Sequence, residues 1–110
     1  MVNEFLVLGE TDNGKVVRCS FCFSKIAFMY KNITQCFLVE DFYKLKDAID
    51  KIDIEDFFSK YPEENKLHMR TEFQELFFSF TAEEIYELKA LLTKAHYKIK
   101  IYDNIQNNLN

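Results

Sequence analysis

The sequence predicts an α+β fold: one antiparallel β-sheet of about six or seven strands with two helices packed on one face. Two observations predict it. Apolar residues alternate with period two in short stretches between residues 5 and 39 and again between 67 and 80. In two later stretches, around 42–52 and 85–95, apolar residues recur at intervals of three and four, as on one face of a helix. Because only 2 glycines and 1 proline occur among 110 residues, disorder and long flexible linkers are not expected.

Four strands are expected before the first helix. The Asn13-Gly14 pair accepts positive φ angles and suits a tight turn between the first two of them. In the third strand Ile26, Phe28 and Tyr30 share one face, and Lys31-Asn32 is the next turn. The expected strands cover residues 5–8, 15–19, 25–30 and 33–39.

The first helix is expected from a stripe of apolar residues spaced by three, four and three: Phe42, Leu45, Ile49 and Ile52. An acidic segment with the single proline then connects to a second strand pair at 67–73 and 76–80. The second helix follows from the stripe Ile85, Leu88, Leu92 and Ala95. Thr81 and Glu84 have the spacing of a capping box at its start. Tyr97, Ile99 and Ile101 alternate with lysines, so residues 97–102 are expected to form an edge strand.

The two halves of the chain resemble each other at an offset of 43 residues. This offset matches Phe42 with Ile85 and Leu45 with Leu88. The similarity indicates either an internal duplication of a strand–strand–helix unit or only the general likeness of two amphipathic helices. The approximate units are 1–54 and 66–102, with a connector at 55–65 and a frayed tail at 103–110.

The core is expected to be rich in aromatic side chains, since the chain contains 12 phenylalanines and 6 tyrosines. The expected core residues are Phe28, Phe37, Phe42, Leu45, Ile49, Phe78, Phe80, Ile85, Leu88 and Leu92.

Length and charge restrict the class of function. A chain of 110 residues is expected to form a single domain. A net charge of −4 provides no basic surface for nucleic acid, and no apolar run approaches the ~20 residues that span a bilayer. The first residues lack the pattern of a signal peptide, and three cysteines fit a reducing compartment. We therefore expect a cytoplasmic protein that binds neither nucleic acid nor membrane.

The pair Cys19 and Cys22 is the sharpest functional signal, and three interpretations of it remain open. A structural zinc ion takes four ligands, and Cys36 on the adjacent strand could supply a third sulfur. Two protomers could also complete such a site across a dimer. A redox pair is normally placed at a helix start, whereas this pair leads into a strand. The third interpretation is that both thiols are reduced and structural, and this is the one we expect.

No catalytic residues are expected, because no polar residues converge at spacings that chemistry requires. The sequence is interpreted as a small non-enzymatic interaction or regulatory protein without a cofactor, whose partner is an unknown protein or a second copy. The alternative is a zinc-binding module. Phe57, Phe58 and Tyr61 lie in the polar connector and either fix it to the core or form an exposed partner patch.

A resemblance to a known family is carried by the segments 10–33, 37–49 and 76–92. They resemble a family of short uncharacterised Bacteroidota proteins with an Asn-Gly turn, a Cys-x-x-Cys, a helix, a strand pair and a leucine-rich helix. The resemblance covers roughly residues 9–95 and makes Cys19 and Cys22 the family-type pair. It implies a fold and a cytoplasmic origin, and no activity.

Overall fold

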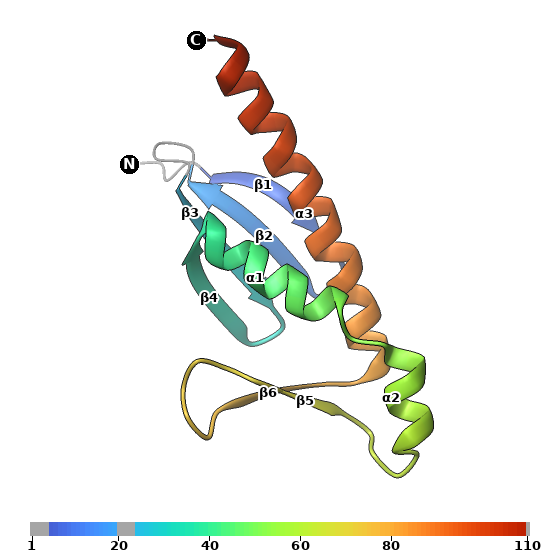
Figure 1. Cartoon of the computed structure of the whole chain (residues 1–110). Helices are drawn as coiled ribbons and strands as arrows, with labels where there is room; N and C mark the ends of the chain where they lie inside the picture. Colours follow the sequence, from blue (N-terminus) through green and yellow to red (C-terminus); the bar gives the residue numbers. More distant parts are fainter. Residues whose placement is uncertain (1–4, 20–23, 110) are drawn as a thin grey trace.

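A computed structural model describes residues 5–19 and 24–109 of the chain, with side chains described as far as residue 105 (Figure 1). The described residues form a mixed α+β fold of six strands and three helices. In chain order these are β1 (Phe5–Glu10), β2 (Gly14–Cys19), β3 (Lys25–Tyr30), β4 (Ile33–Leu38), α1 (Val39–Asp50), α2 (Ile54–Lys60), β5 (Leu67–Arg70), β6 (Phe77–Phe80) and α3 (Ala82–Leu109).

The strands are antiparallel, as predicted, but they form two sheets rather than one. One sheet has four strands in the order β1-β2-β3-β4, and the other is the hairpin β5-β6. The hairpin packs its apolar face, which includes Met69 and Phe78, against the core instead of continuing the ladder at β4. Its last residue, Phe80, places its ring edge-on to Tyr30, with 6.1 Å between the ring centres.

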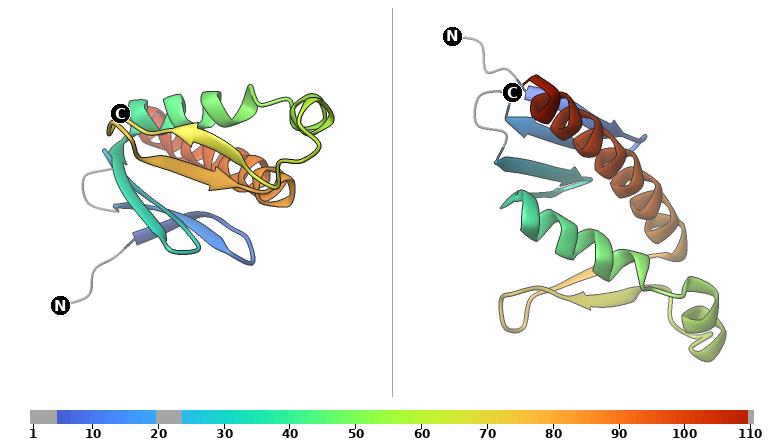
Figure 2. Two further views of the ribbon diagram at one scale, coloured as in Figure 1. Left: turned by 90° about the horizontal axis from the view of Figure 1, so that it is seen from below. Right: turned by 45° about the horizontal axis from the view of Figure 1, so that its top comes forward.

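The helices α1 and α3 lie on the same face of the four-stranded sheet, which confirms the prediction for the two expected helices (Figures 1 and 2). Helix α3 crosses β1 and β2, and α1 lies beside it over β3 and β4. Lys89 of α3 donates a hydrogen bond of 2.6 Å to the carbonyl of Ile52 and one of 3.3 Å to that of Asp50, so it holds the end of α1 against α3.

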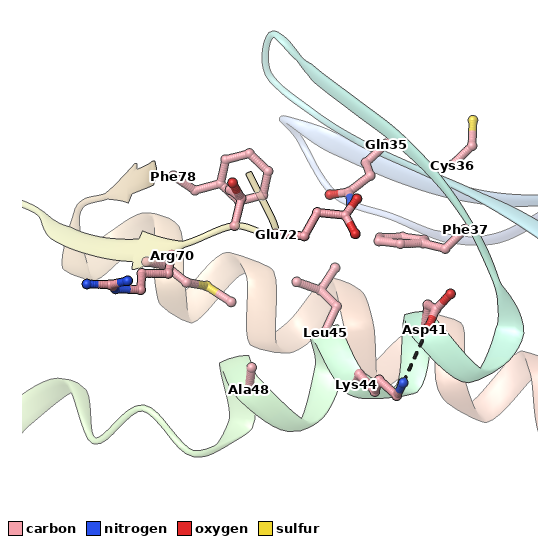
Figure 3. Close-up of a pocket in the computed structure, with 12 residues that line it drawn as sticks. Gln35, Cys36, Phe37, Asp41, Lys44, Leu45, Ala48, Arg70, Glu72 and Phe78 are labelled. Carbon is pink, nitrogen blue, oxygen red and sulfur yellow. Dashed lines mark ion pairs between the residues drawn. The ribbon is translucent and has the colours of Figure 1, made fainter. Parts of the chain in front are cut away.

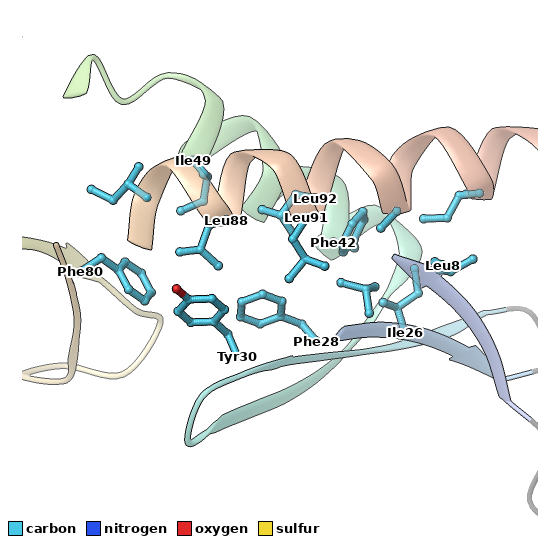
Figure 4. Close-up of a cluster of buried hydrophobic side chains, with 14 of the residues drawn as sticks. Leu8, Ile26, Phe28, Tyr30, Phe42, Ile49, Phe80, Leu88, Leu91 and Leu92 are labelled. Atoms are coloured by element: carbon cyan, nitrogen blue, oxygen red, sulfur yellow. The ribbon is translucent and has the colours of Figure 1, made fainter. Parts of the chain in front are cut away.

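The core lies between the four-stranded sheet and these two helices (Figure 4). Every expected core residue packs there: Phe28, Phe42, Ile49, Phe80, Ile85, Leu88 and Leu92 are buried, and Phe37, Leu45 and Phe78 are partly buried against them. Truncation of one of the fully buried side chains to alanine is expected to cost about 2–5 kcal/mol.

The expected edge strand at 97–102 is wrong, because α3 continues through it to Leu109. Ile99 is fully buried and extends the stripe of Leu92 and Ala95 by four more residues. Tyr97 and Ile101, which alternate with Ile99 in the sequence, are exposed on other sides of the helix. The alternation was therefore coincidental, and no turn residue separates it from the preceding helical pattern.

The first turn also differs from the prediction. Gly14 is the first residue of β2 and has no positive φ angle; the turn is closed by the Thr11 N–H, which donates to the Gly14 carbonyl at 2.9 Å. Glycine is needed here because a Cβ atom would lie 2.8 Å from side-chain atoms of both Leu91 and Tyr30. A positive φ angle, of 52°, occurs instead at Lys31 in the next turn.

Two helix starts follow simple capping chemistry. The capping box is confirmed: the Thr81 N–H donates to Glu84 at 2.8 Å, and the Glu84 N–H donates to the Thr81 hydroxyl at 3.1 Å. The connector contains α2, a helix of 7 residues, whose N-cap Asp53 accepts a hydrogen bond of 3.0 Å from the Asp56 N–H.

Candidate functional site

The face of the four-stranded sheet opposite α1 and α3 is covered by no element of the described part of the chain (Figure 2). We call it the open face. Side chains alternate along each strand, and Val16, Phe28 and their register neighbours point to the helices. The open face therefore consists of Phe5, Val7 and Glu10 of β1, Lys15, Val17 and Cys19 of β2, Lys25, Ala27 and Met29 of β3, and Thr34, Cys36 and Leu38 of β4.

The open face is unusually apolar for a sheet face that meets solvent. Antiparallel sheets with one solvated face normally place polar residues there. On this sheet the polar residues occupy only the strand ends, and an apolar row crosses all four strands in the middle: Val7, Val17, Ala27 and Cys36. The large side chains around this row remain accessible, with exposed fractions of 54% for Phe5, 48% for Val7 and 44% for Leu38.

Val17 shows that the open face already forms a small cluster of its own. Its side chain is only 8% exposed, yet it does not belong to the core between the sheet and the helices. Apolar side chains of the neighbouring strands must cover it on the open face.

Both described cysteines belong to the open face but do not meet. Cys19 is partly buried at the end of β2, and Cys36 is exposed on β4, with β3 between them. Two strand spacings of ~4.8 Å put the two backbones roughly 10 Å apart. Two sulfur ligands of one zinc ion lie only about 4 Å apart. Cys22 falls outside the described residues, and within those residues no group of three or more His, Cys, Asp or Glu side chains could hold a metal.

The aromatic residues of the connector lie on and just after α2. The ring of Phe57 contacts Phe58 at 4.9 Å and Tyr61 at 5.1 Å between ring centres. Phe58 packs against the core, whereas Tyr61 is half-exposed. The cluster thus joins the connector to the core at one end and leaves one ring at the surface.

A groove runs along β4 between that strand and the β5-β6 hairpin (Figure 3). It comprises two cavities of about 360 Å³ and about 350 Å³. We call it the β4 groove. Both cavities are lined by Gln35, Cys36, Thr71, Glu72 and Phe78, so they follow one another along the same strand.

A carboxylate cluster joins the start of α3 to two turns of the sheet. Glu87 accepts hydrogen bonds from the Asn13 N–H at 3.0 Å, the Asn13 amide at 2.9 Å and the Tyr30 hydroxyl at 2.8 Å. Burial alone would raise the pKa of Glu87, but hydrogen bonds from its neighbours lower it to about 2. Burial and this carboxylate in turn raise the pKa of Tyr30. Lys31 forms an ion pair of 2.6 Å with Glu84 beside them.

The two histidines lie away from the open face. His68 shares a hydrogen bond of 2.6 Å with the Ser79 hydroxyl on the exposed side of the hairpin. His96 lies in the middle of α3 rather than at a helix end, and its ring packs edge-on against Tyr43 at 5.0 Å. Burial, and then Lys46 and Lys100, lower the pKa of His96, so the neutral imidazole is favoured at this position.

These features define a small α+β domain whose helices cover one face of an antiparallel sheet and leave an apolar face open. The chain belongs to a family of unknown function, DUF6686, whose model matches residues 1–109. Neither the curated proteins nor the solved structures include a significant match. Among the described residues, no helix combines the length and the apolar character needed to cross a bilayer.

Proposed function

We propose that this protein is a non-enzymatic interaction protein, and that a second copy of the chain packs its own open face against this one. The apolar row that crosses all four strands supports this proposal most directly. It has apolar residues at the centre and polar residues at the rim, which is the arrangement of protein interfaces. Because the rim carries Glu10 as well as Lys15 and Lys25, two copies can place opposite charges against each other.

The size of the open face predicts weak association. Four strands at ~4.8 Å and six residues at ~3.4 Å give a flat area of roughly 400 Å². A stable interface buries about 800 Å² of accessible surface on each partner. We therefore expect a dissociation constant on the order of micromolar rather than nanomolar.

Sedimentation velocity over a concentration series tests the proposal. The wild-type mass should rise from monomer toward dimer across the micromolar range, and Val7→Glu should remain a monomer. Val7 is half-exposed, so this change should leave the fold intact. Tyr97→Glu is the matched control, since Tyr97 is 67% exposed on α3, away from the open face. A wild-type monomer at every concentration, or equal behaviour of both variants, would refute the proposal.

Zinc binding is a second candidate function, supported by the position of Cys19. It lies on the open face, so two faces that meet would bring this thiol of both copies into one interface. Metal analysis of protein purified without added metal, together with a Cys19→Ser, Cys22→Ser double variant, decides the matter. We expect no stoichiometric zinc and a loss of only ~1–3 kcal/mol of stability. Stoichiometric zinc that the double variant loses, with gross destabilisation, would establish the second function instead.

We also propose a reducing compartment such as the cytoplasm as the location. Cys19 and Cys36 are free thiols in the structure, and free thiols persist best in that environment.

A further inference from the structure

The outer edge of β4 carries unpaired backbone groups. β4 pairs with β3 on one side, and no other strand in the described ranges pairs with its second side. Tyr30 and Ile33 close a two-residue turn, which makes them a hydrogen-bonded pair of the ladder. Because such pairs alternate along an antiparallel ladder, the N–H and C=O groups of Thr34 and Cys36 and the N–H of Leu38 point to the outer edge. The Leu38 carbonyl is at the N-cap of α1, where it accepts the first hydrogen bond of that helix.

The β4 groove follows this edge along its length. Its first cavity extends from β4 to α1, and its second from β4 to the turn that precedes it. The strand has 6 residues and is therefore ~20 Å long. A six-residue extended segment matches the edge, and the hairpin supplies the opposite wall of the groove.

We propose that the β4 groove binds an extended segment of a partner protein, which adds to the sheet as a fifth strand beside β4. In this arrangement alternate side chains of the segment enter the cavity, where Leu45, Met69 and Phe78 favour apolar groups. The remaining side chains point outward, on the same side as Cys36.

The charges in the groove favour a basic segment. Glu72 projects from the hairpin toward β4 in Figure 3, and no described residue forms an ion pair or hydrogen bond with it. Of the two cations, Lys44 pairs with Asp41 at 3.6 Å, and Arg70 lies over the ring of Phe77 at 5.9 Å. In Figure 3 the Arg70 guanidinium points away from β4, so the charge that faces β4 without a partner among the described residues is the negative charge of Glu72. The segment that fits best alternates apolar residues with lysine or arginine.

A labelled peptide tests this proposal by fluorescence anisotropy. The probe is a capped eight-residue peptide in which valine and lysine alternate. We expect it to bind, and we expect Glu72→Gln to weaken binding about 2–5-fold, as removal of one partly exposed ion pair does. Glu63→Gln, at an exposed position of the connector, is the matched control and should not change the affinity.

Backbone methylation separates strand addition from simple charge attraction. In an antiparallel arrangement the lysine N–H groups face β4, and in a parallel one the valine N–H groups do so. N-methylation of one set should therefore abolish binding, while methylation of the other set should not. Thr34→Pro should also weaken binding at least 10-fold, because it removes a donor from the outer edge only.

Three results with peptides would overturn the proposal. These are absence of binding at millimolar peptide, equal binding of both methylated peptides, and tighter binding of a peptide with glutamate in place of lysine. Self-association that Thr34→Pro abolishes, without peptide binding, would assign the groove to a second copy and also overturn it. Val7→Glu should leave peptide binding unchanged, so the two proposals fail separately.

Discussion

Glu87 connects α3 to the turn before β2 and to the end of β3. Its carboxylate accepts hydrogen bonds from the turn before β2 and from the last residue of β3, while its backbone belongs to α3. A carboxylate with several good donors is stabilised in its charged form. The structure uses this charge to fix the start of α3 above the end of the sheet.

The first prediction concerns this carboxylate. The pKa of Glu87 is about 2 in the folded protein, below the ordinary value of 4.5. Its contribution to stability is therefore complete above pH ~4.5 and is lost as the pH falls toward 2. We expect Glu87→Gln to lower the free energy of unfolding by about 1–2 kcal/mol at pH 7.

Urea unfolding of both proteins at pH 7 and at pH 3 measures the effect. The difference between wild type and Glu87→Gln should shrink at pH 3. Glu83→Gln serves as the control, since Glu83 is exposed on the same helical turn and should change stability little. A stability difference that stays constant with pH would show that folding does not lower the pKa of Glu87.

Among the elements, α3 differs most from the sequence-based prediction, because it continues through residues 97–102, where an edge strand was expected. It has 28 residues, so it is ~42 Å long and extends past the edge of the sheet (Figure 1). The second prediction uses Lys98, an exposed residue within the segment that resembled a strand. Lys98→Ala should be neutral, and Lys98→Gly should destabilise by about 1 kcal/mol, as in a solvent-exposed helix.

A strand at this position would rank the substitutions differently. Valine would be better than alanine, because β-branched residues favour strands. Thermal unfolding of Lys98→Ala, Lys98→Val and Lys98→Gly distinguishes the two cases. Greater stability of the valine variant than of the alanine variant would contradict a helix through residue 98.

Most of the elements could be predicted from local patterns. The six strands before α3, the helix at α1 and the capping box at Thr81 each depend on neighbouring residues, and the structure contains all of them. Some bounds differ: β1 extends to Glu10 instead of residue 8, and β5 ends at Arg70 instead of residue 73. The extent of α3 was predictable too, since Leu92, Ala95 and Ile99 continue one helical stripe. It was missed because Tyr97, Ile99 and Ile101 alternate as in a strand, while Ile99 also continues the helical stripe, and only tertiary packing chooses between the two patterns.

The open face and the β4 groove depend on how elements far apart in the sequence pack against each other, and the sequence pattern contains little information about this packing. One signal was present: β1 and β3 are apolar in both phases of their alternation, which is typical of strands covered on both faces. The groove was not predictable, because it arises from the hairpin's failure to pair with β4. Its position follows from how the second half of the chain packs on the first.

At the scale of the whole molecule, one ion pair joins distant parts of the chain. Arg18 of β2 lies 3.2 Å from Asp103 near the end of α3, and its side chain is only 5% exposed. Removing a partner from a buried charge costs more than removing one from a surface pair. Arg18 keeps another interaction, so the loss is not complete.

The third prediction follows from this pair. Asp103→Asn should lower the free energy of unfolding by about 1–2 kcal/mol, with little dependence on salt. Asp47→Asn is the control, because its ion pair with Lys51 is exposed, and it should cost at most about 0.5 kcal/mol. Equal effects in denaturant unfolding would mean that Asp103 does not support the buried arginine.

The position of α3 also determines when the protein can fold during synthesis. β1 leaves the ribosome first, yet its inner side is covered by α3, which is made last. Helix α1 can cover β3 and β4 as soon as it has been made, but until about residue 100 has emerged, β1 and β2 present apolar side chains on both faces of the sheet. Nascent chains in this state are prone to associate with chaperones or with each other. The interval between the first strand and the last helix is thus the period in which this small protein is most exposed to aggregation.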